Sequence, residues 1–149
     1  MKEIVFALEF KGSATPVPGA EGKLRAKTTA SSQVFRTALT AKGVETALET
    51  ERDGVATFES EVEIIGEGTF VESGSITYGT GGKVTFKTVG RGILGPSGVM
   101  GLQRGAVIWE VTGGEGQFAG ATGLITSNFT VGAEGEVVDN HFARLFLPS

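Results

Sequence analysis

The chain has 149 residues, no cysteine, one histidine and a formal net charge of −4 from 13 basic and 17 acidic residues. A domain of this length buries about 70% of its unfolded surface, so we expect a single domain, residues 1–149, whose core needs no disulfides. The missing cysteines exclude thiolate catalysis, and a lone histidine excludes a multi-histidine metal site within the chain. The acidic balance argues against nucleic-acid binding.

Targeting and membrane signals are also missing from the pattern. No stretch reaches the roughly 18 apolar residues of a membrane span. The short apolar run near the N-terminus is broken by Glu9 and Lys11, so it lacks the hydrophobic region of a secretory signal. We therefore expect a soluble, cytoplasmic protein that contacts neither membrane nor nucleic acid and binds no cofactor or metal.

The first segments of the chain predict strands. Ile4, Phe6, Leu8 and Phe10 alternate with residues of the opposite face, which indicates a strand with one buried side. Residues 31–51 are ambiguous. Their apolar positions have helical spacing and Gly43 suits a helix end, yet threonine-rich strands around residues 41–43 fit equally well. Because the rest of the chain predicts strands, we favour strands here too.

Residues 56–64 show the clearest alternation, with apolar side chains on one face and acidic ones on the other. After a Gly-Glu-Gly turn, residues 69–78 predict the next strand. There Glu72 shares a face with Phe70, Ile76 and Tyr78, and a carboxyl group among them would have a raised pKa suited to general acid or base catalysis. Gly74 offers an alternative, because a bulge at this glycine would turn Glu72 outward.

A glycine-rich hairpin leads to the strand at residues 83–89, which completes a three-strand meander. The following segment, residues 90–105, contains Gly90-Arg91-Gly92-Ile93-Leu94-Gly95 and so matches the dinucleotide-binding pattern G-x-G-x-x-G. That site requires a helix after the third glycine, and Pro96 with the glycines beyond it forbids one. We expect instead a flexible loop that acts as a lid at one end of the fold.

The strand at residues 106–112 carries two candidate site residues. Trp109 is expected to contact a ligand, and Glu110 is a second candidate acid or base. If Val107, Trp109 and Val111 face the core, Glu110 points outward, and a subunit interface on the outer face would reverse that assignment.

The next hairpin reads Gly113-Gly114-Glu115-Gly116-Gln117-Phe118-Ala119-Gly120-Ala121-Thr122-Gly123. Its glycines permit bulges and close strand approach, and Phe118 is expected to plug one end of the core. The hairpin resembles that of the allene oxide cyclase and dirigent β-barrel superfamily, roughly Gly-Gly-Thr-Gly-x-Phe-x-x-Ala-x-Gly, with Glu115 in place of the threonine. The resemblance implies a barrel around a small-molecule cavity, although members differ in activity.

Residues 124–131 and 136–147 predict the last two strands, which a Gly-Ala-Glu-Gly turn connects. In the final strand, Asn140, Phe142 and Arg144 share one face, while Asp139 and His141 share the other. Either face mixes polar and apolar groups as a ligand pocket does. His141 oriented by Asp139 would serve as an acid or base, whereas Arg144 with Asn140 would bind a carboxylate or enolate oxygen.

These patterns predict an all-β fold, a single antiparallel barrel of about eight strands. We expect its cavity to open beside residues 90–105. Three functions fit this fold: a cofactor-free isomerase or cyclase, as the resemblance implies, a carrier of a small hydrophobic ligand, or a structural barrel with a filled interior. The candidate acids and bases are His141, Glu72 and Glu110, and the candidate ligand contacts are Tyr78, Trp109, Asn140, Phe142 and Arg144.

A homo-oligomer, dimer or trimer, is expected from the last strand. Val138, Phe142 and Phe146 lie on the face opposite Leu145 and Leu147, and a strand that is apolar on both faces needs a second covering surface.

Overall fold

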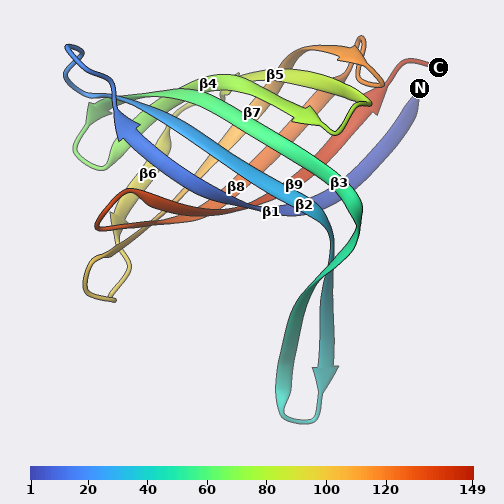
Figure 1. Ribbon diagram of the computed structural model, residues 1–149, viewed down its shortest axis with the longest axis horizontal. Helices are drawn as coiled ribbons and strands as arrows, with labels where there is room; N and C mark the ends of the chain where they lie inside the picture. The colour runs from blue at the N-terminus through green and yellow to red at the C-terminus, as the bar shows by residue number, and fades with distance from the viewer.

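The computed structural model describes residues 1–149 and consists of strands and turns, without a helix that could cross a membrane. The nine strands are β1 (Lys2–Pro16), β2 (Lys23–Thr40), β3 (Gly43–Gly66), β4 (Thr69–Tyr78), β5 (Gly82–Thr88), β6 (Gly92–Pro96), β7 (Leu102–Gly116), β8 (Thr122–Gly132) and β9 (Glu136–Leu147). All neighbouring strands pair antiparallel, and Figure 1 shows them wrapped into a barrel.

Eight strands form the closed ring, in the order β3, β2, β1, β9, β8, β7, β5, β4 and back to β3. The ninth strand, β6, fills a gap in this ring between β4 and β7. Because β5 ends at Thr88, the first part of β4 has no partner on that side, and β6 fills the space by pairing with both β4 and β7. The predicted antiparallel barrel of about eight strands is confirmed.

The ring turns the two-residue alternation of each strand into an inside and an outside. The inward side chains form one hydrophobic cluster that includes Phe10, Phe58, Phe86 and Trp109. Residues 31–51 belong to strands β2 and β3, apart from the turn at residues 41 and 42, so the strand prediction for this ambiguous segment is confirmed.

Aromatic side chains close one end of the barrel. Phe118 is buried, and its ring centroid lies 5.1 Å from that of Tyr78, which in turn meets Phe6 at 5.2 Å. The predicted role of Phe118 as the plug of one end of the core is confirmed. Any cavity must therefore open at the opposite end, where β1, β3, β6 and β8 finish and β2, β4, β7 and β9 begin.

The outer halves of β2 and β3 leave the barrel as a long hairpin, residues 31–55, which we call the arm (Figure 1). At its base the register jumps, because residues 51–54 have no partners in β2, and such bulges bend a strand. The Gln33 side chain bonds the backbone of β1 at the place where β2 leaves the barrel. Its amide oxygen accepts from the Glu9 N–H and its amide nitrogen donates to the Glu9 carbonyl, both at 2.8 Å, as a neighbouring strand would.

Gly74 lies opposite Ser60 in an unshifted stretch of the β3–β4 register. A Cβ at position 74 would stand 2.1 Å from the Glu59 carbonyl oxygen and 2.8 Å from the Ser60 Cα. We expect Gly74→Ala to lower the free energy of unfolding by about 2 kcal/mol or more, because the backbone must shift to admit the methyl group. Urea denaturation measures this loss.

Gly54→Ala is the matched control, because a Cβ there would meet only the Ser32 Cβ at 3.9 Å. Its stability should stay within about 0.5 kcal/mol of the wild type, as for most surface changes. Equal stabilities of the two variants would contradict the steric explanation.

Candidate functional site

The open end of the barrel contains a cavity of about 490 Å³, a volume in the range of small-molecule sites. Its walls are mainly apolar, and the side chains come from all around the ring. The apolar lining includes Leu24, Phe58, Val62, Phe70, Leu94, Phe129 and Val137. The cavity is therefore shaped for a molecule that is largely hydrophobic.

Two aromatic rings owe their place at the cavity to glycines. The Phe70 ring lies where a Cβ at Gly92 would be, 2.2 Å from its Cζ, and the Phe129 ring covers Gly105 in the same way at 2.4 Å. The rings meet edge to face with centroids 5.9 Å apart. Much of the segment expected to be a flexible lid, residues 90–105, thus belongs to β6 and β7, and its glycines make room for these rings.

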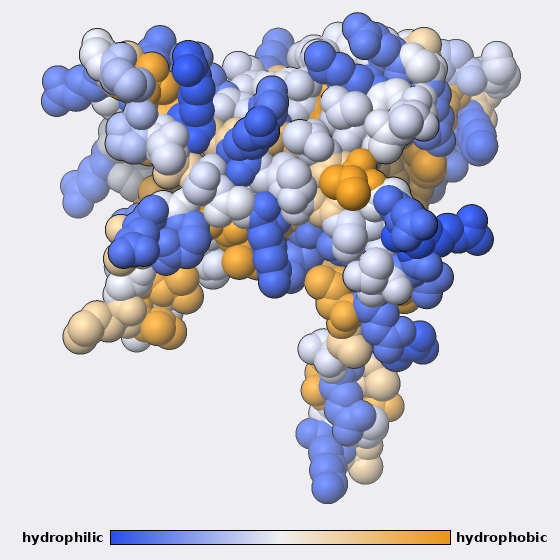
Figure 2. All heavy atoms as spheres, in the orientation of Figure 1, coloured by the Kyte–Doolittle hydropathy of each residue, from blue (hydrophilic) through white to orange (hydrophobic).

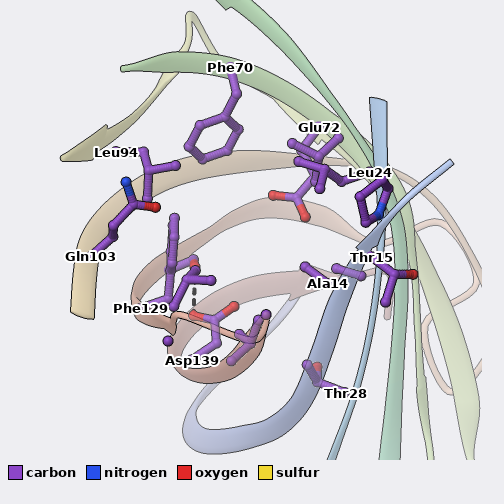
Figure 3. Close-up of a pocket in the computed structure, with 18 of the residues that line it drawn as sticks. Ala14, Thr15, Leu24, Thr28, Phe70, Glu72, Leu94, Gln103, Phe129 and Asp139 are labelled. Atoms are coloured by element: carbon purple, nitrogen blue, oxygen red, sulfur yellow. Dashed lines mark hydrogen bonds between the residues drawn. The ribbon is translucent and has the colours of Figure 1, made fainter. Parts of the chain in front are cut away.

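We call the deepest part of the cavity the floor; it consists of Thr28, Phe58, Glu72, Ser127 and Asp139. Two of these residues are acidic. Glu72 lies on β4 and Asp139 on β9, which are four strands apart in either direction around the ring. Figure 3 shows both carboxyl groups directed into the space between these walls. The floor thus presents a pair of facing carboxyl groups to any ligand.

Glu72 points inward because β4 pairs with β3 and β5 without a bulge at Gly74. Its carboxyl group is buried and has two partners. The Ser60 hydroxyl donates to Oε2 at 2.5 Å, and the Trp109 indole donates to Oε1 at 3.2 Å. These bonds hold the carboxyl group in one orientation at the bottom of the cavity.

Burial raises the pKa of Glu72 from 4.5 to about 7 because the apolar surroundings disfavour its charged form. The negative charge of Asp139 raises this pKa further, while the hydrogen bonds from Ser60 and Trp109 lower it. Glu72 therefore exchanges its proton near neutral pH, which is the property required of a general acid or base.

Asp139 is held by two donors, the Ser127 hydroxyl to Oδ1 at 2.6 Å and the His141 Nε2 to Oδ2 at 2.9 Å. His141 does not line the cavity; it lies one inward position deeper on β9. Its ring stacks on Phe10 at 4.3 Å and is close to Phe58 and Trp109. His141 therefore orients Asp139 from below the floor, and a ligand in the cavity does not reach it.

Two buried polar atoms lack hydrogen-bond partners, Thr28 Oγ1 and His141 Nδ1. An unpaired buried polar atom costs about 1–3 kcal/mol, so each one calls for an explanation. The Thr28 residue lines the cavity, where a ligand atom would supply the missing partner. His141 Nδ1 sits among aromatic rings instead.

The other predicted site residues lie elsewhere. Glu110 is exposed on the outer wall, so the expectation that it acts in the cavity does not agree with the structure. Asn140, Phe142 and Arg144 also point outward because β9 directs its other face inward, and Arg144 bonds Glu3 at 2.7 Å.

The two remaining predicted contacts do lie inside the barrel. Tyr78 belongs to the closed end, far along β4 from the floor, and burial raises its pKa. Trp109 does not line the cavity and reaches it only through Glu72.

Three polar residues of the site were not predicted: Thr28, Ser60 and Ser127. Their common signal is a small hydroxyl residue at an inward position between apolar neighbours of the same face, such as Ser127 between Ile125 and Phe129. For Asp139, the sequence predicts the orientation of His141 and a place on one of the two mixed faces of the last strand. The described residues bring no three metal-ligating side chains together, and the charged groups lining the cavity, Glu72, Glu134 and Asp139, are all acidic.

Neither a protein-family model nor a curated protein matches the chain, but solved structures do. The pterocarpan synthase dirigent protein GePTS1 superposes with a TM-score of 0.60 at 12% identity, over 99% of this chain and 89% of that chain. The pterocarpan synthase dirigent protein PsPTS1 gives a TM-score of 0.57 at 14% identity, over 99% of this chain and 97% of that chain. The likeness shows that the fold is a dirigent-like barrel.

The raised pKa of Glu72 makes stability depend on pH. The folded state binds this proton more tightly than the unfolded state, so the stabilisation is full below pH 4.5 and is lost as pH rises to about 7. The loss corresponds to about 3 kcal/mol. We expect Glu72→Gln, which keeps a neutral side chain, to lack this loss, as measured by urea denaturation across that range. Parallel curves for the wild type and E72Q would contradict the assignment, and exposed Glu110→Gln is the control.

Trp109 is the sole tryptophan of the chain and bonds Glu72 directly, so its fluorescence reports the charge of that carboxyl group. We expect the emission to change with a midpoint near pH 7 and the change to vanish in E72Q. The His141 ring centroid is 5.0 Å from the indole, so His141→Gln is the second control. A transition that survives in E72Q and disappears in H141Q would refute the assignment to Glu72.

Proposed function

We propose that the protein binds one small apolar molecule in the cavity and catalyses a cofactor-free proton transfer on it, as in an isomerisation or cyclisation. Glu72 is the group that exchanges the proton. The observation that carries this proposal is a carboxyl group with a pKa of about 7 on the floor of an otherwise largely apolar cavity. Ligand burial there excludes water, which strengthens electrostatic interactions with the substrate.

The charge of the lining selects the substrate class. Every ionisable side chain that lines the cavity is acidic, so a ligand anion would meet repulsion without a compensating cation. We therefore propose an uncharged substrate whose polar end reaches the floor. A hydrogen-bonding atom at that end would also pair with the unpartnered hydroxyl of Thr28.

In the proposed reaction, the Glu72 carboxylate removes a proton from a carbon activated by a neighbouring electron-withdrawing group. The resulting carboxylic acid returns the proton at a second position, so atoms and charge balance without an oxidant. Ser60 and Trp109 keep the carboxyl group in place during both steps. Asp139, held by Ser127 and His141, contributes the negative charge that favours the protonated form of Glu72.

Transport of the same class of molecule without chemistry is a second candidate. It is favoured by the observation that, of the six polar candidate residues, only Glu72 lines the cavity directly, whereas convergence of two or more on the cavity would favour an enzyme. The six are Glu72, Tyr78, Glu110, Asn140, His141 and Arg144. Both oxygens of Glu72 also have partners within the protein. A carrier would bind the ligand equally well with or without the titrating proton.

A generic substrate of proton abstraction separates the two candidates. Nitrobenzisoxazole is small, neutral and apolar, and loss of its ring C–H proton to a base breaks the N–O bond and releases a coloured cyanophenolate. We expect the wild type to accelerate this reaction with a rate that rises through about pH 7, as Glu72 ionises. Glu72→Gln should lower the rate by about 10² or more, the usual contribution of a general base.

Binding is measured in parallel with the neutral fluorophore prodan, whose emission shifts in apolar surroundings. Wild type and E72Q should bind it alike, because glutamine preserves the shape of the floor, and Glu110→Gln should change neither binding nor rate. Equal rates in wild type and E72Q with intact binding would reject catalysis and favour the carrier. Failure of the wild type to bind neutral probes would reject both candidates.

A further inference from the structure

The arm has two unlike faces. Cross-strand pairing places Phe35 opposite Leu48 and Leu39 opposite Val44, so these four apolar residues share one face, with threonines between the two pairs. All four are exposed, Leu39 by 82%. The other face is charged, and it includes the Arg36–Glu49 ion pair at 3.2 Å. Figure 2 shows the arm projecting from the body of the molecule with hydrophobic side chains uncovered.

A two-stranded hairpin without further packing is marginally stable at best in water. The arm has no third strand beside it, because its halves of β2 and β3 pair only with each other. Its apolar face therefore requires a surface to cover it, and that surface does not come from the same chain.

The barrel carries a matching surface, which we call the outer patch: Val5, Ile108, Leu124 and Phe142. Each of these side chains is 43–48% exposed on the outer wall formed by β1, β9, β8 and β7. Ladder pairing aligns Ile108, Thr126, Phe142 and Ala7 in one row across the four strands. This row is uncharged along its length, as is the arm face that carries the two apolar pairs. The adjacent row of the patch places Arg144, which is paired with Glu3, between Val5 and Leu124.

We infer that the arm of one chain packs on the outer patch of a second copy, and that a two-fold dimer exchanges both arms in this way. The dimensions agree: the two apolar pairs of the arm are four residues apart, about 13 Å, and the row spans three strand spacings, about 14 Å. A lipid surface is a poorer occupant because the chain has a net charge of −4 and the second arm face carries acidic residues.

The contact area favours the two-fold arrangement. The paired part of the arm, with eight residues in a strand and two strands in width, presents a face of about 260 Å². One arm on one patch buries about twice that area, which is below the size of a stable interface. Two exchanged arms in one interface bury about 1,000 Å², which reaches the lower limit of a biological interface. A ring with one arm contact per interface would fall short.

Light scattering coupled to size-exclusion chromatography tests the dimer at micromolar concentration. We expect a wild-type mass of twice 15.4 kDa. Leu39→Lys in the arm and Phe142→Glu in the patch should each give a folded monomer, whose unfolding midpoint falls only by the stabilisation that dimerisation supplied. The controls are Ala47→Lys on the charged arm face and Ser75→Lys on the outer surface of β4, and both should remain dimeric.

Mixing the L39K and F142E proteins provides the decisive measurement. In a two-fold exchange, the mixed pair has one wild-type arm on a wild-type patch and one L39K arm on an F142E patch, where the charges attract. We expect the mixture to recover a dimer that neither protein forms alone. A wild-type monomer, a trimer, a dimer unaffected by either substitution, or a mixture that stays monomeric would overturn the inference. Sedimentation of monomeric wild-type protein with phosphatidylcholine vesicles would also overturn the inference, because a lipid surface would then cover the arm.

Discussion

The pairing of β3 with β4 is the constraint on which the rest of the structure depends, because it closes the sheet into a ring. Once closed, the ring assigns every second residue to a confined interior, whatever its chemistry. Glu72, Asp139 and His141 are inside for this reason, in the same alternation that buries Phe70 and Leu145. Because β5 is short, β4 and β7 are not bridged by it at the end where the cavity opens. There β6 pairs with both strands and keeps the ring closed.

The interior divides along the barrel axis into a packed part and an open part. Aromatic rings fill the length from Phe118 to Phe58, and polar groups appear where the packing ends. Burial of two carboxyl groups without a cation is unfavourable in free energy. Hydrogen bonds donated by Ser60, Trp109, Ser127 and His141 offset this unfavourable free energy. Because every oxygen of the two carboxyl groups accepts a hydrogen bond, the geometry of the floor is fixed before any ligand arrives.

The sequence predicts the strands well, because alternation is a local signal, and it identifies Phe118 from the glycines around it. It leaves the inward face of β9 undecided, since Asn140 with Phe142 and Asp139 with His141 are equally mixed sets. Only the register with β1 and β8 decides between them. Gly74 was read as a possible bulge, whereas it serves close approach of β3 and β4, a contact between segments that no local pattern contains. No local pattern predicts Ser60 and Ser127 as site residues, because their role depends on carboxyl groups on neighbouring strands.

The amide of Gln33 has a consequence for how this architecture varies. By reproducing the hydrogen bonds of a neighbouring strand at Glu9, it completes the β1 edge at the place where β2 turns away. The arm beyond it shares no strand pairing with the rest of the barrel, so its length is not tied to the geometry of the ring. Insertions and deletions between residues 34 and 50 can therefore accumulate without breaking the strand pairing of the barrel. The hairpin is the segment in which related chains are free to diverge in size while the interior stays the same.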